Sequence, residues 1–325
     1  MGETGLKFGV LGSLQLSVEG TPLPLGAPKQ RAALAMLVIN RNRPVGVESL
    51  INAVWDESPV PAAQASIHSY ISNLRRLLGN AGIDTHTVLV SAPPGYRLNV
   101  ADADCDLGRF TVEMTAGIRA AAAGRFEQAS SHLSAALAEW RAPVLDDLRD
   151  FPFVDAFATA LMEDKVLAHT ARAEAEIACG RAYAVIGELE ALSDEHPFRE
   201  PLWAQLITAY YVAERQSDAL EAYRLKTTLA DDLGIDPGPT VRALHARILR
   251  QEPLNTKRAA QRTAADTITN AKRRSAAGGQ SVLAGLRDTA GRHFPLRAVA
   301  TRIGRRSDND IVLTDDDVGT SWWWG

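Results

Sequence analysis

The strongest constraint on the fold of this chain is a repeat of 34 residues inside a long helical segment. Two turn-like pairs, Gly180-Arg181 and Glu214-Arg215, are separated by that distance. The surrounding sequence, from residue 102 to 252, is rich in alanine and leucine, has helical hydrophobic periodicity and contains few strand signals. A period of this length, with a turn between two helical stretches, is typical of stacked helical hairpins. We therefore predict an all-α body for this part of the chain.

Apolar residues in the second repeat have the spacing of the tetratricopeptide pattern. The positions that this pattern assigns to Trp, Leu, Tyr, Ala and Phe are occupied by Trp203, Leu206, Tyr210, Ala219 and Tyr223. Small residues let paired helices approach closely, and the aromatic residues fill the space between layers. These residues are therefore predicted to form the core of the body, in preference to a cofactor site.

An earlier copy of the repeat is predicted at Gly124-Arg125-Phe126 and Ala129, displaced by an insertion between Trp140 and Pro152. In the last copy, Glu214 occupies the turn position at which such repeats usually have glycine. A residue with a side chain in a tight turn between two helices is expected to be strained.

The first hundred residues have a different pattern, in which strands flank three helices. Residues 6–18 alternate as strands do, and Glu19-Gly20 then marks a turn. The predicted helices begin at Ala27-Pro28, span Val47 to Trp55, and span about Ala62 to Leu78; a strand pair follows at Thr87–Ser91 and Tyr96–Val100. Three helices followed by a terminal hairpin predict a winged-helix domain.

The third helix of this domain has two distinct faces. Its apolar residues fall within an arc of roughly 60° at 3.6 residues per turn: Ile67, Ile71, Leu74 and Leu78. The opposite side has small and polar residues, Ala65, Ser69, Ser72 and Arg76, flanked by Ser66, Asn73 and Arg75. Such a face can enter a DNA major groove. The alternative is an ordinary amphipathic helix with a solvated polar side.

Several segments of the first hundred residues resemble the OmpR-type DNA-binding domain, in the version found in actinobacterial regulators of the AfsR/DnrI/RedD family. They are Lys29-Gln30-Arg31, Glu48-Ser49-Leu50, Val54-Trp55, Leu74 to Gly79 and Pro94 to Leu98. The resemblance implies double-stranded DNA as a partner. It places Ser66, Ser69, Ser72 and Asn73 toward bases, Arg75 and Arg76 on bases or backbone, and Arg97 with the hairpin toward the minor groove.

The helical body resembles the bacterial transcriptional activation domain that follows the winged helix in the same regulators. The segments concerned are His196 to Trp203 and Leu233 to Pro239. This resemblance implies contact with RNA polymerase and formation of a homodimer.

The end of the chain resembles the opening strands of a forkhead-associated domain, a β-sandwich that binds phosphothreonine. Phe294-Pro295-Leu296, Ala300 to Arg305 and Ser307 to Leu313 are similar to it, and the resemblance implies that Arg305 contacts phosphate. The Ser-Arg-x-His segment of that family is replaced by Val318 to Gly325. We therefore predict a truncated fragment with a vestigial phosphopeptide site that does not bind phosphothreonine tightly.

Charge is divided unevenly along the chain. Residues 1–100 have a net charge of +2, residues 101–252 of −11 and residues 253–325 of +5. A weakly basic head on an acidic body suits a protein that binds a polyanion with one end only. The longest apolar stretch, Ala32 to Ile39, is much shorter than the roughly 20 residues that cross a bilayer, so a cytoplasmic location without membrane contact is predicted.

Signals for catalysis, metal or cofactor binding are missing from the sequence. Cys105 and Cys179 stand apart from other ligand residues and are predicted to be free thiols. His68 and His86 have no ligand partner at suitable spacing and are assigned surface or flank roles. There is no phosphate-binding glycine loop and no nucleophile–His–acid signature. We therefore predict no catalytic residues, cofactor or metal, and an enzyme is the weakest of the functions considered.

Together these observations predict a mainly α protein with four segments: an OmpR-type winged helix-turn-helix domain (1–101), a tetratricopeptide-like bacterial transcriptional activation domain (102–252), a flexible basic linker (253–281) and an incomplete β-rich forkhead-associated fragment (282–325). The predicted function is sequence-specific DNA binding in transcriptional regulation. A mycobacterial branch of the family has these parts in this order, which implies a link to Ser/Thr protein kinases and to cell-wall arabinan genes. The alternative is a non-activating decoy that binds a kinase or a full-length relative.

Overall fold

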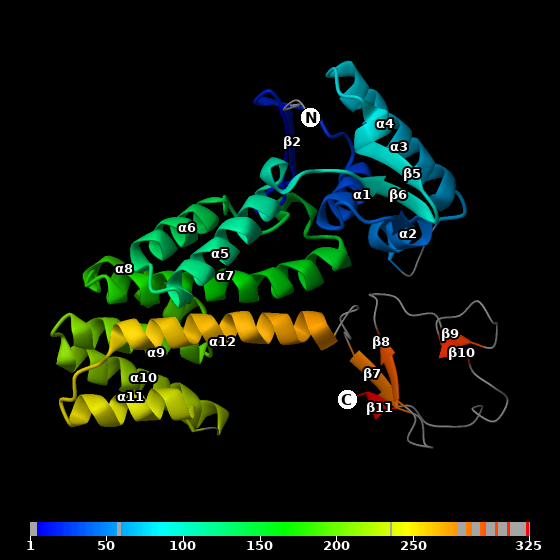
Figure 1. Ribbon diagram of the computed structural model, residues 1–325. Coiled ribbons are helices and arrows are strands. Elements are labelled where there is room, and N and C mark those ends of the chain that lie inside the picture. Colours follow the sequence, from blue (N-terminus) through cyan, green and yellow to red (C-terminus); the bar gives the residue numbers. More distant parts are fainter. Residues whose placement is uncertain are drawn as a thin grey trace. The chain divides into compact units, whose positions relative to one another are not determined.

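The computed structural model of the chain describes residues 5–56, 60–234 and 236–277, and five short strands beyond them. It divides into two compact units, Met1–Ala264 and Ala265–Gly325. The first unit holds both a winged-helix head and a helical body (Figure 1). No helix in the described residues is both long and apolar enough to span a membrane.

The head has a small N-terminal sheet, three main helices and a C-terminal hairpin, as the sequence predicts. Its elements are β1 (Leu6–Gly9), β2 (Gln15–Val18), β3 (Thr21–Pro22), α1 (Pro28–Ile39), β4 (Val45–Gly46), α2 (Val47–Trp55), α3 (Ala63–Asn80), α4 (Thr85–Val88), β5 (Leu89–Ala92) and β6 (Gly95–Leu98). The first three strands form an antiparallel sheet, and β6 lies between β4 and β5 in a second sheet. The short helix α4 occupies the start of the segment expected to be the first hairpin strand.

The apolar stripe of α3 forms part of the head's core. Ile67, Ile71, Leu74 and Leu78 are all at most 3% exposed. They pack where α3 crosses α1 and α2, so burial of this stripe fixes how α3 is rotated about its own axis. The prediction that these four aliphatic residues face inward is confirmed.

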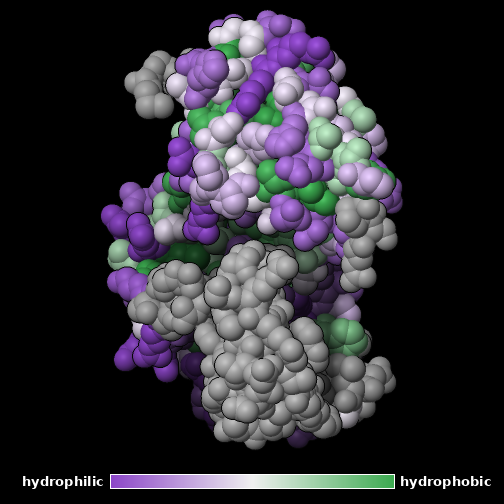
Figure 2. Space-filling model, turned by 90° about the vertical axis from the view of Figure 1, so that its right-hand side faces the viewer, coloured by the Kyte–Doolittle hydropathy of each residue, from purple (hydrophilic) through white to green (hydrophobic). Residues whose placement is uncertain are grey.

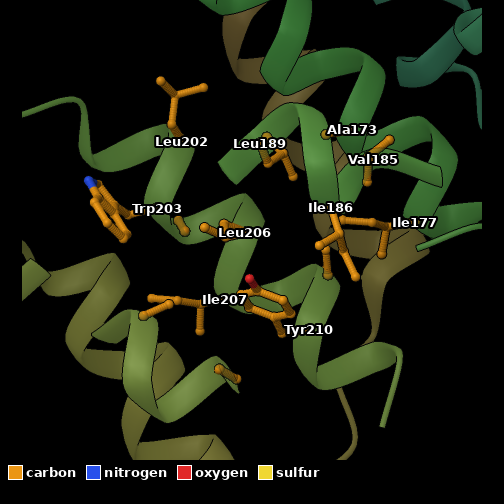
Figure 3. Packing of buried hydrophobic residues seen from close by; sticks show 14 of the residues in the cluster. Ala173, Ile177, Val185, Ile186, Leu189, Leu202, Trp203, Leu206, Ile207 and Tyr210 are labelled. Atoms are coloured by element: carbon orange, nitrogen blue, oxygen red, sulfur yellow. The ribbon is translucent and has the colours of Figure 1, made fainter. Parts of the chain in front are cut away.

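The body consists of antiparallel helices, most of them joined by short turns, with a longer connection over residues 139–151 (Figure 1). They are α5 (Asp106–Ala122), α6 (Phe126–Ala138), α7 (Pro152–Ala178), α8 (Tyr183–Glu195), α9 (Glu200–Val212), α10 (Gln216–Leu233) and α11 (Pro239–Leu249). Figure 3 shows side chains from α7, α8 and α9 gathered in one apolar cluster. Trp203, Leu206, Tyr210 and Ala219 are buried there, and Tyr223 packs against the cluster. The prediction that these repeat positions form the core is confirmed.

The turns between paired helices share one backbone conformation. Gly124, Gly180 and Glu214 follow the last turns of α5, α7 and α9, and all three have positive φ, at 73°, 81° and 62°. At each turn the next residue donates its N–H to a carbonyl five positions earlier, as Arg215 does to Tyr210 at 2.9 Å. This closure is the Schellman motif, which favours glycine. The expected strain at Glu214 is therefore present.

Head and body are joined by a buried carboxylate at the start of α5. Asp106, only 2% exposed, accepts hydrogen bonds from the backbone N–H groups of Val10 and Leu11, both at 2.9 Å. The same carboxylate accepts a hydrogen bond from Arg141 Nη2 at 3.1 Å. A residue of the body thus satisfies backbone donors of the head's first loop, which would otherwise be buried without partners.

The insertion predicted between the first two repeats provides the other half of this junction. Asp147 accepts hydrogen bonds from the backbone N–H of Leu14 and from Arg31 Nη1, both at 2.7 Å. Leu145 is fully buried and donates its N–H to the carbonyl of Val10 at 3.2 Å. The insertion therefore fastens the body to the head.

The structure corrects the prediction of a flexible linker over residues 253–281. A helix, α12 (Thr256–Ala277), occupies most of that segment. Ala260 and Ala264 lie one turn apart and are 2% and 7% exposed, and Ala260 packs with Phe126 and Ala178. Alanine, lysine and arginine are strong helix formers, but a contact face made of alanine is not evident from hydrophobic periodicity.

Beyond α12, the structure describes five short strands of the second unit. They are β7 (Ala284–Arg287), β8 (His293–Leu296), β9 (Ile303–Gly304), β10 (Ile311–Val312) and β11 (Trp323–Trp324). β7 pairs antiparallel with β8 and β11, whereas β9 and β10 pair in parallel. The forkhead-associated fragment stays a prediction, and Arg305 lies outside the described residues.

Candidate nucleic-acid interface

The candidate recognition surface of the head is the polar face of α3. Ser69, Ser72 and Arg76 are exposed, and they lie one turn apart on the side opposite the buried aliphatic stripe. Neither the head nor the body covers these three side chains. On the face shown in Figure 2, the head is covered mainly by hydrophilic and neutral residues, with smaller apolar patches between them. Short hydroxyl side chains beside one arginine allow close approach to base edges and phosphates.

Two of the flanking residues have partners within the head. Ser66 Oγ donates to the carbonyl of Ala62 at 3.0 Å, a local bond within the helix. Asn73 Nδ2 donates to Gln30 Oε1 at 3.2 Å, and Asn73 Oδ1 accepts from Arg76 Nη2 at 3.1 Å. Asn73 therefore links α3 to α1 and holds the guanidinium of Arg76. Both flanking residues are half-buried.

Arg75 is used to brace α3 against the hairpin. Its Nε donates to the carbonyl of Leu89 at 3.0 Å, and its Nη2 donates to Ser91 Oγ at 3.1 Å. The guanidinium also lies over the ring of Tyr96, 5.6 Å from its centroid. The resemblance assigns Arg75 to bases or backbone of DNA, whereas in the structure two of its N–H groups donate to β5 and its guanidinium covers a ring of β6.

His68, for which the sequence predicts only a surface or flank role, belongs to the same surface. It is exposed on α3, one turn before Ser72, and its Nδ1 lies 2.6 Å from the hydroxyl of Tyr96. This contact fixes the ring next to the exposed serines. The signal that could have identified it is its spacing of four residues from Ser72, which places both residues on one side of the helix. A search for metal ligands misses this signal, because it compares His68 only with other ligand residues.

The remaining predicted residues contribute less to this surface. Arg97 on β6 is half-buried, and its Nε is buried without a hydrogen-bond partner in the described part of the chain. Aromatic contacts join α3 to the other two helices. Trp55 of α2 stacks on Tyr70 of α3 with 6.3 Å between ring centroids, and Lys29 of α1 lies over the Trp55 ring. The site is thus a ridge on one helix, held by α1, α2 and the hairpin.

A metal site is not formed by the described residues. Among them, no three His, Cys, Asp or Glu side chains gather as metal ligands. Cys105 is buried and Cys179 half-buried, and both are free. Burial raises the pKa of each thiol, which disfavours the reactive thiolate.

Comparison with protein families divides the chain in the same order as the fold. The family model described as "Transcriptional regulatory protein, C terminal" matches residues 20–98, which lie in the head. The model described as "Bacterial transcriptional activator domain" matches residues 105–249, from α5 to α11.

Known proteins match over most of the chain. EmbR of Mycobacterium tuberculosis (strain H37Rv), a transcriptional regulatory protein, is 70% identical over 318 residues, which are 97% of this chain and 82% of that protein. MoaR1 of the same strain is 54% identical over 252 residues, 77% of this chain and 81% of that protein. A solved structure described as M. tuberculosis EmbR in complex with low affinity phosphopeptide has a TM-score of 0.86 and 69% identity, covering 98% of this chain and 84% of that one. The chain therefore belongs to the EmbR-like transcriptional regulators of the AfsR/DnrI/RedD family.

Proposed function

We propose that this regulator recognises a specific sequence in double-stranded DNA by inserting α3 into the major groove. The observation that carries this proposal is the exposed ridge of Ser69, Ser72 and Arg76, which lies opposite a buried stripe that fixes its direction. Arg76, held by Asn73, supplies the charged contact, and the serines supply short hydrogen bonds. Ser66 of α3 and Arg97 of β6 are proposed as further DNA contacts, and Arg75 positions α3 relative to the hairpin.

The body is assigned to protein partners. Stacked helical hairpins provide an extended surface suited to RNA polymerase or to a second copy of the chain. Its net charge of −11 argues against a second DNA-binding surface there. A cytoplasmic location is proposed, because the DNA that such a regulator binds lies there. No catalytic activity is proposed.

The proposed input is phosphorylation-dependent signalling from a Ser/Thr protein kinase, with cell-wall arabinan genes among the targets. Support comes from the EmbR structure with a phosphopeptide, described for a relative that is 69% identical. The alternative of a decoy that does not bind DNA is less favoured, because such a protein needs no exposed polar ridge on α3.

Fluorescence anisotropy with operator and scrambled duplexes tests the DNA proposal. Loss of one base-contacting arginine costs about 1–3 kcal/mol, so Arg76→Ala should weaken operator binding by about tenfold or more. Arg250→Ala removes the same charge from an exposed position in the body and is the matched control. Wild-type binding should also weaken steeply with salt.

The decoy predicts a different result. In that case the wild-type protein would ignore both duplexes at low salt, and a purified kinase or full-length relative would still capture it. If wild type and Arg76→Ala bind the operator with equal affinity, the proposal that α3 contacts the DNA is wrong.

A further inference from the structure

Almost every arginine of the acidic body is paired with a carboxylate. Thirteen arginines lie between residues 102 and 252, and in the described part of the body eleven of them form ion pairs with Asp or Glu. The two exceptions are Arg119 and Arg125. This segment has 26 acidic and 15 basic residues, so carboxylates are plentiful, and two arginines without one are unexpected.

These two arginines line the same surface hollow. It has a volume of about 400 Å³ and lies between the end of α5 and the first two turns of α6. Gln128, Ser131 and His132 contribute polar side chains to its lining, and no Asp or Glu lines it. Glu113 holds His132 at Nδ1, 2.7 Å away, which leaves Nε2 as the remaining polar atom of that ring. Ligand sites typically have volumes of roughly 300–1,000 Å³.

The helical repeat provides an internal comparison for Arg125. The residue after the positive-φ turn position is an arginine in three successive turns: Arg125, Arg181 and Arg215. Arg181 pairs with Glu176 and Glu127, and Arg215 pairs with Asp218. In those turns the arginine has a structural partner in the fold. Arg125 has the same place in its turn but no carboxylate among the described residues.

The position of Arg125 is also electrostatically unfavourable for the isolated fold. It is the N-cap residue of α6, where the partial positive charge of the helix terminus disfavours a cation. Arg119 lies in the last turn of α5, close to the same turn. An anion in the hollow would interact favourably with both guanidinium groups.

We propose that this hollow binds a phosphomonoester group through Arg119 and Arg125. A carboxylate has two oxygens, which a single guanidinium can satisfy, whereas a phosphate group has three terminal oxygens and a charge near −2. Two guanidinium groups with the serine and glutamine donors of the lining match the larger set. A nucleic-acid strand is a poorer fit, because its closely spaced charges need a row of basic contacts and the body has a net charge of −11. The group therefore belongs to a phosphorylated protein side chain or to a small phosphate ester.

Calorimetry on the full chain tests this site with three probes: inorganic phosphate, a phosphothreonine peptide and the same peptide without phosphate. An Arg305→Ala background separates the hollow from the tail. The Arg119→Ala/Arg125→Ala variant should lose at least about tenfold in affinity, the loss expected for one charge-assisted hydrogen bond. Lysine at both positions should restore only part of it, because lysine lacks the planar fork. The double variant Arg224→Ala/Arg250→Ala, with side chains 78% and 61% exposed, removes the same two charges and is the control.

Each outcome decides the proposal. Tighter binding of the phosphopeptide than of inorganic phosphate indicates a phosphorylated protein side chain, and equal binding indicates a small ester. Absence of saturable binding by either phosphate probe, or equal affinity in the double alanine variant, overturns the site. The double variant should leave operator binding, measured on the same samples, unchanged. If the phosphate site is disproved, the DNA proposal is therefore unaffected.

Discussion

At residue 214 the backbone has a conformation that favours glycine, but the chain has glutamate. Its φ of 62° is close to those of Gly124 and Gly180 at the equivalent turns. A left-handed conformation costs a residue with a side chain about 1–2 kcal/mol, partly offset by the greater freedom of glycine in the unfolded chain. Glu214→Gly should therefore raise the free energy of unfolding by about 0.5–1 kcal/mol. Urea denaturation followed by circular dichroism measures this change.

Two variants separate backbone strain from the loss of charge at this turn. Glu214→Ala removes the carboxylate and keeps Cβ, so the free energy of unfolding should stay within about 0.5 kcal/mol of wild type. Gly180→Ala should lower it by about 1 kcal/mol through backbone strain alone, because a Cβ added there meets no atom within 4 Å. If Glu214→Ala stabilises as much as Glu214→Gly, charge and not strain is the cause.

Among the helices, α12 depends on a carboxyl group of α7 for part of its contact with the body. Gln205 Nε2 on α9 donates to Glu174 Oε1 at 2.8 Å, and Thr263 on α12 hydrogen-bonds the same carboxyl. Burial raises the pKa of Glu174 from 4.5 to about 8. At neutral pH the folded protein therefore holds a proton that the unfolded chain releases. The contribution to stability is complete below pH 4.5 and is lost as the pH rises toward 8.

Replacing this carboxyl by its neutral analogue tests the contribution. Between pH 5 and 8 the wild-type free energy of unfolding should fall relative to that of Glu174→Gln, by at most about 1.4 kcal/mol per pH unit. Urea titrations at pH 5.5, 6.5 and 7.5 measure the difference. Glu163→Gln, whose side chain is 54% exposed, should follow the wild-type slope. Parallel slopes for wild type and Glu174→Gln would show that the carboxyl is ionised in the fold.

The same helices show what sequence patterns can and cannot predict. α3 was predictable because four large aliphatic residues repeat on one face, and their burial determines which residues point outward. α12 was not, because its contact face consists of Ala260 and Ala264. The hydropathy of an alanine is the same whether the residue is buried or exposed, so the sequence does not mark this face. The role of Arg75 also depends on a distant carbonyl of β5, and side-chain spacing within one helix contains no information about such a partner.

Head and body are held together by complementary polar groups at their junction, a carboxylate of the body and backbone N–H groups of the head. Asp106 accepts backbone hydrogen bonds from Val10 and Leu11 of the head and from Leu107 of its own helix. Arg141 supplies a further charged donor to the same carboxylate. A carboxylate with this many donors is satisfied only while head and body remain docked. This buried carboxylate therefore contributes to the orientation of α3 relative to the body.

Asp106→Asn tests this coupling, since the amide replaces one acceptor oxygen by a donor that faces backbone N–H groups. Leaving such groups unsatisfied costs about 2–4 kcal/mol, so unfolding of head and body should separate into two transitions, and amides of residues 10–14 should exchange faster with solvent. Asp102→Asn is the control at the rim of the junction: its side chain is 58% exposed and pairs with Arg41, and an exposed pair contributes less than about 1 kcal/mol. Because the exposed ridge of α3 is untouched, Asp106→Asn should retain operator affinity while head and body lose their fixed arrangement. A single unchanged transition in Asp106→Asn would show that apolar contacts alone hold the two parts together.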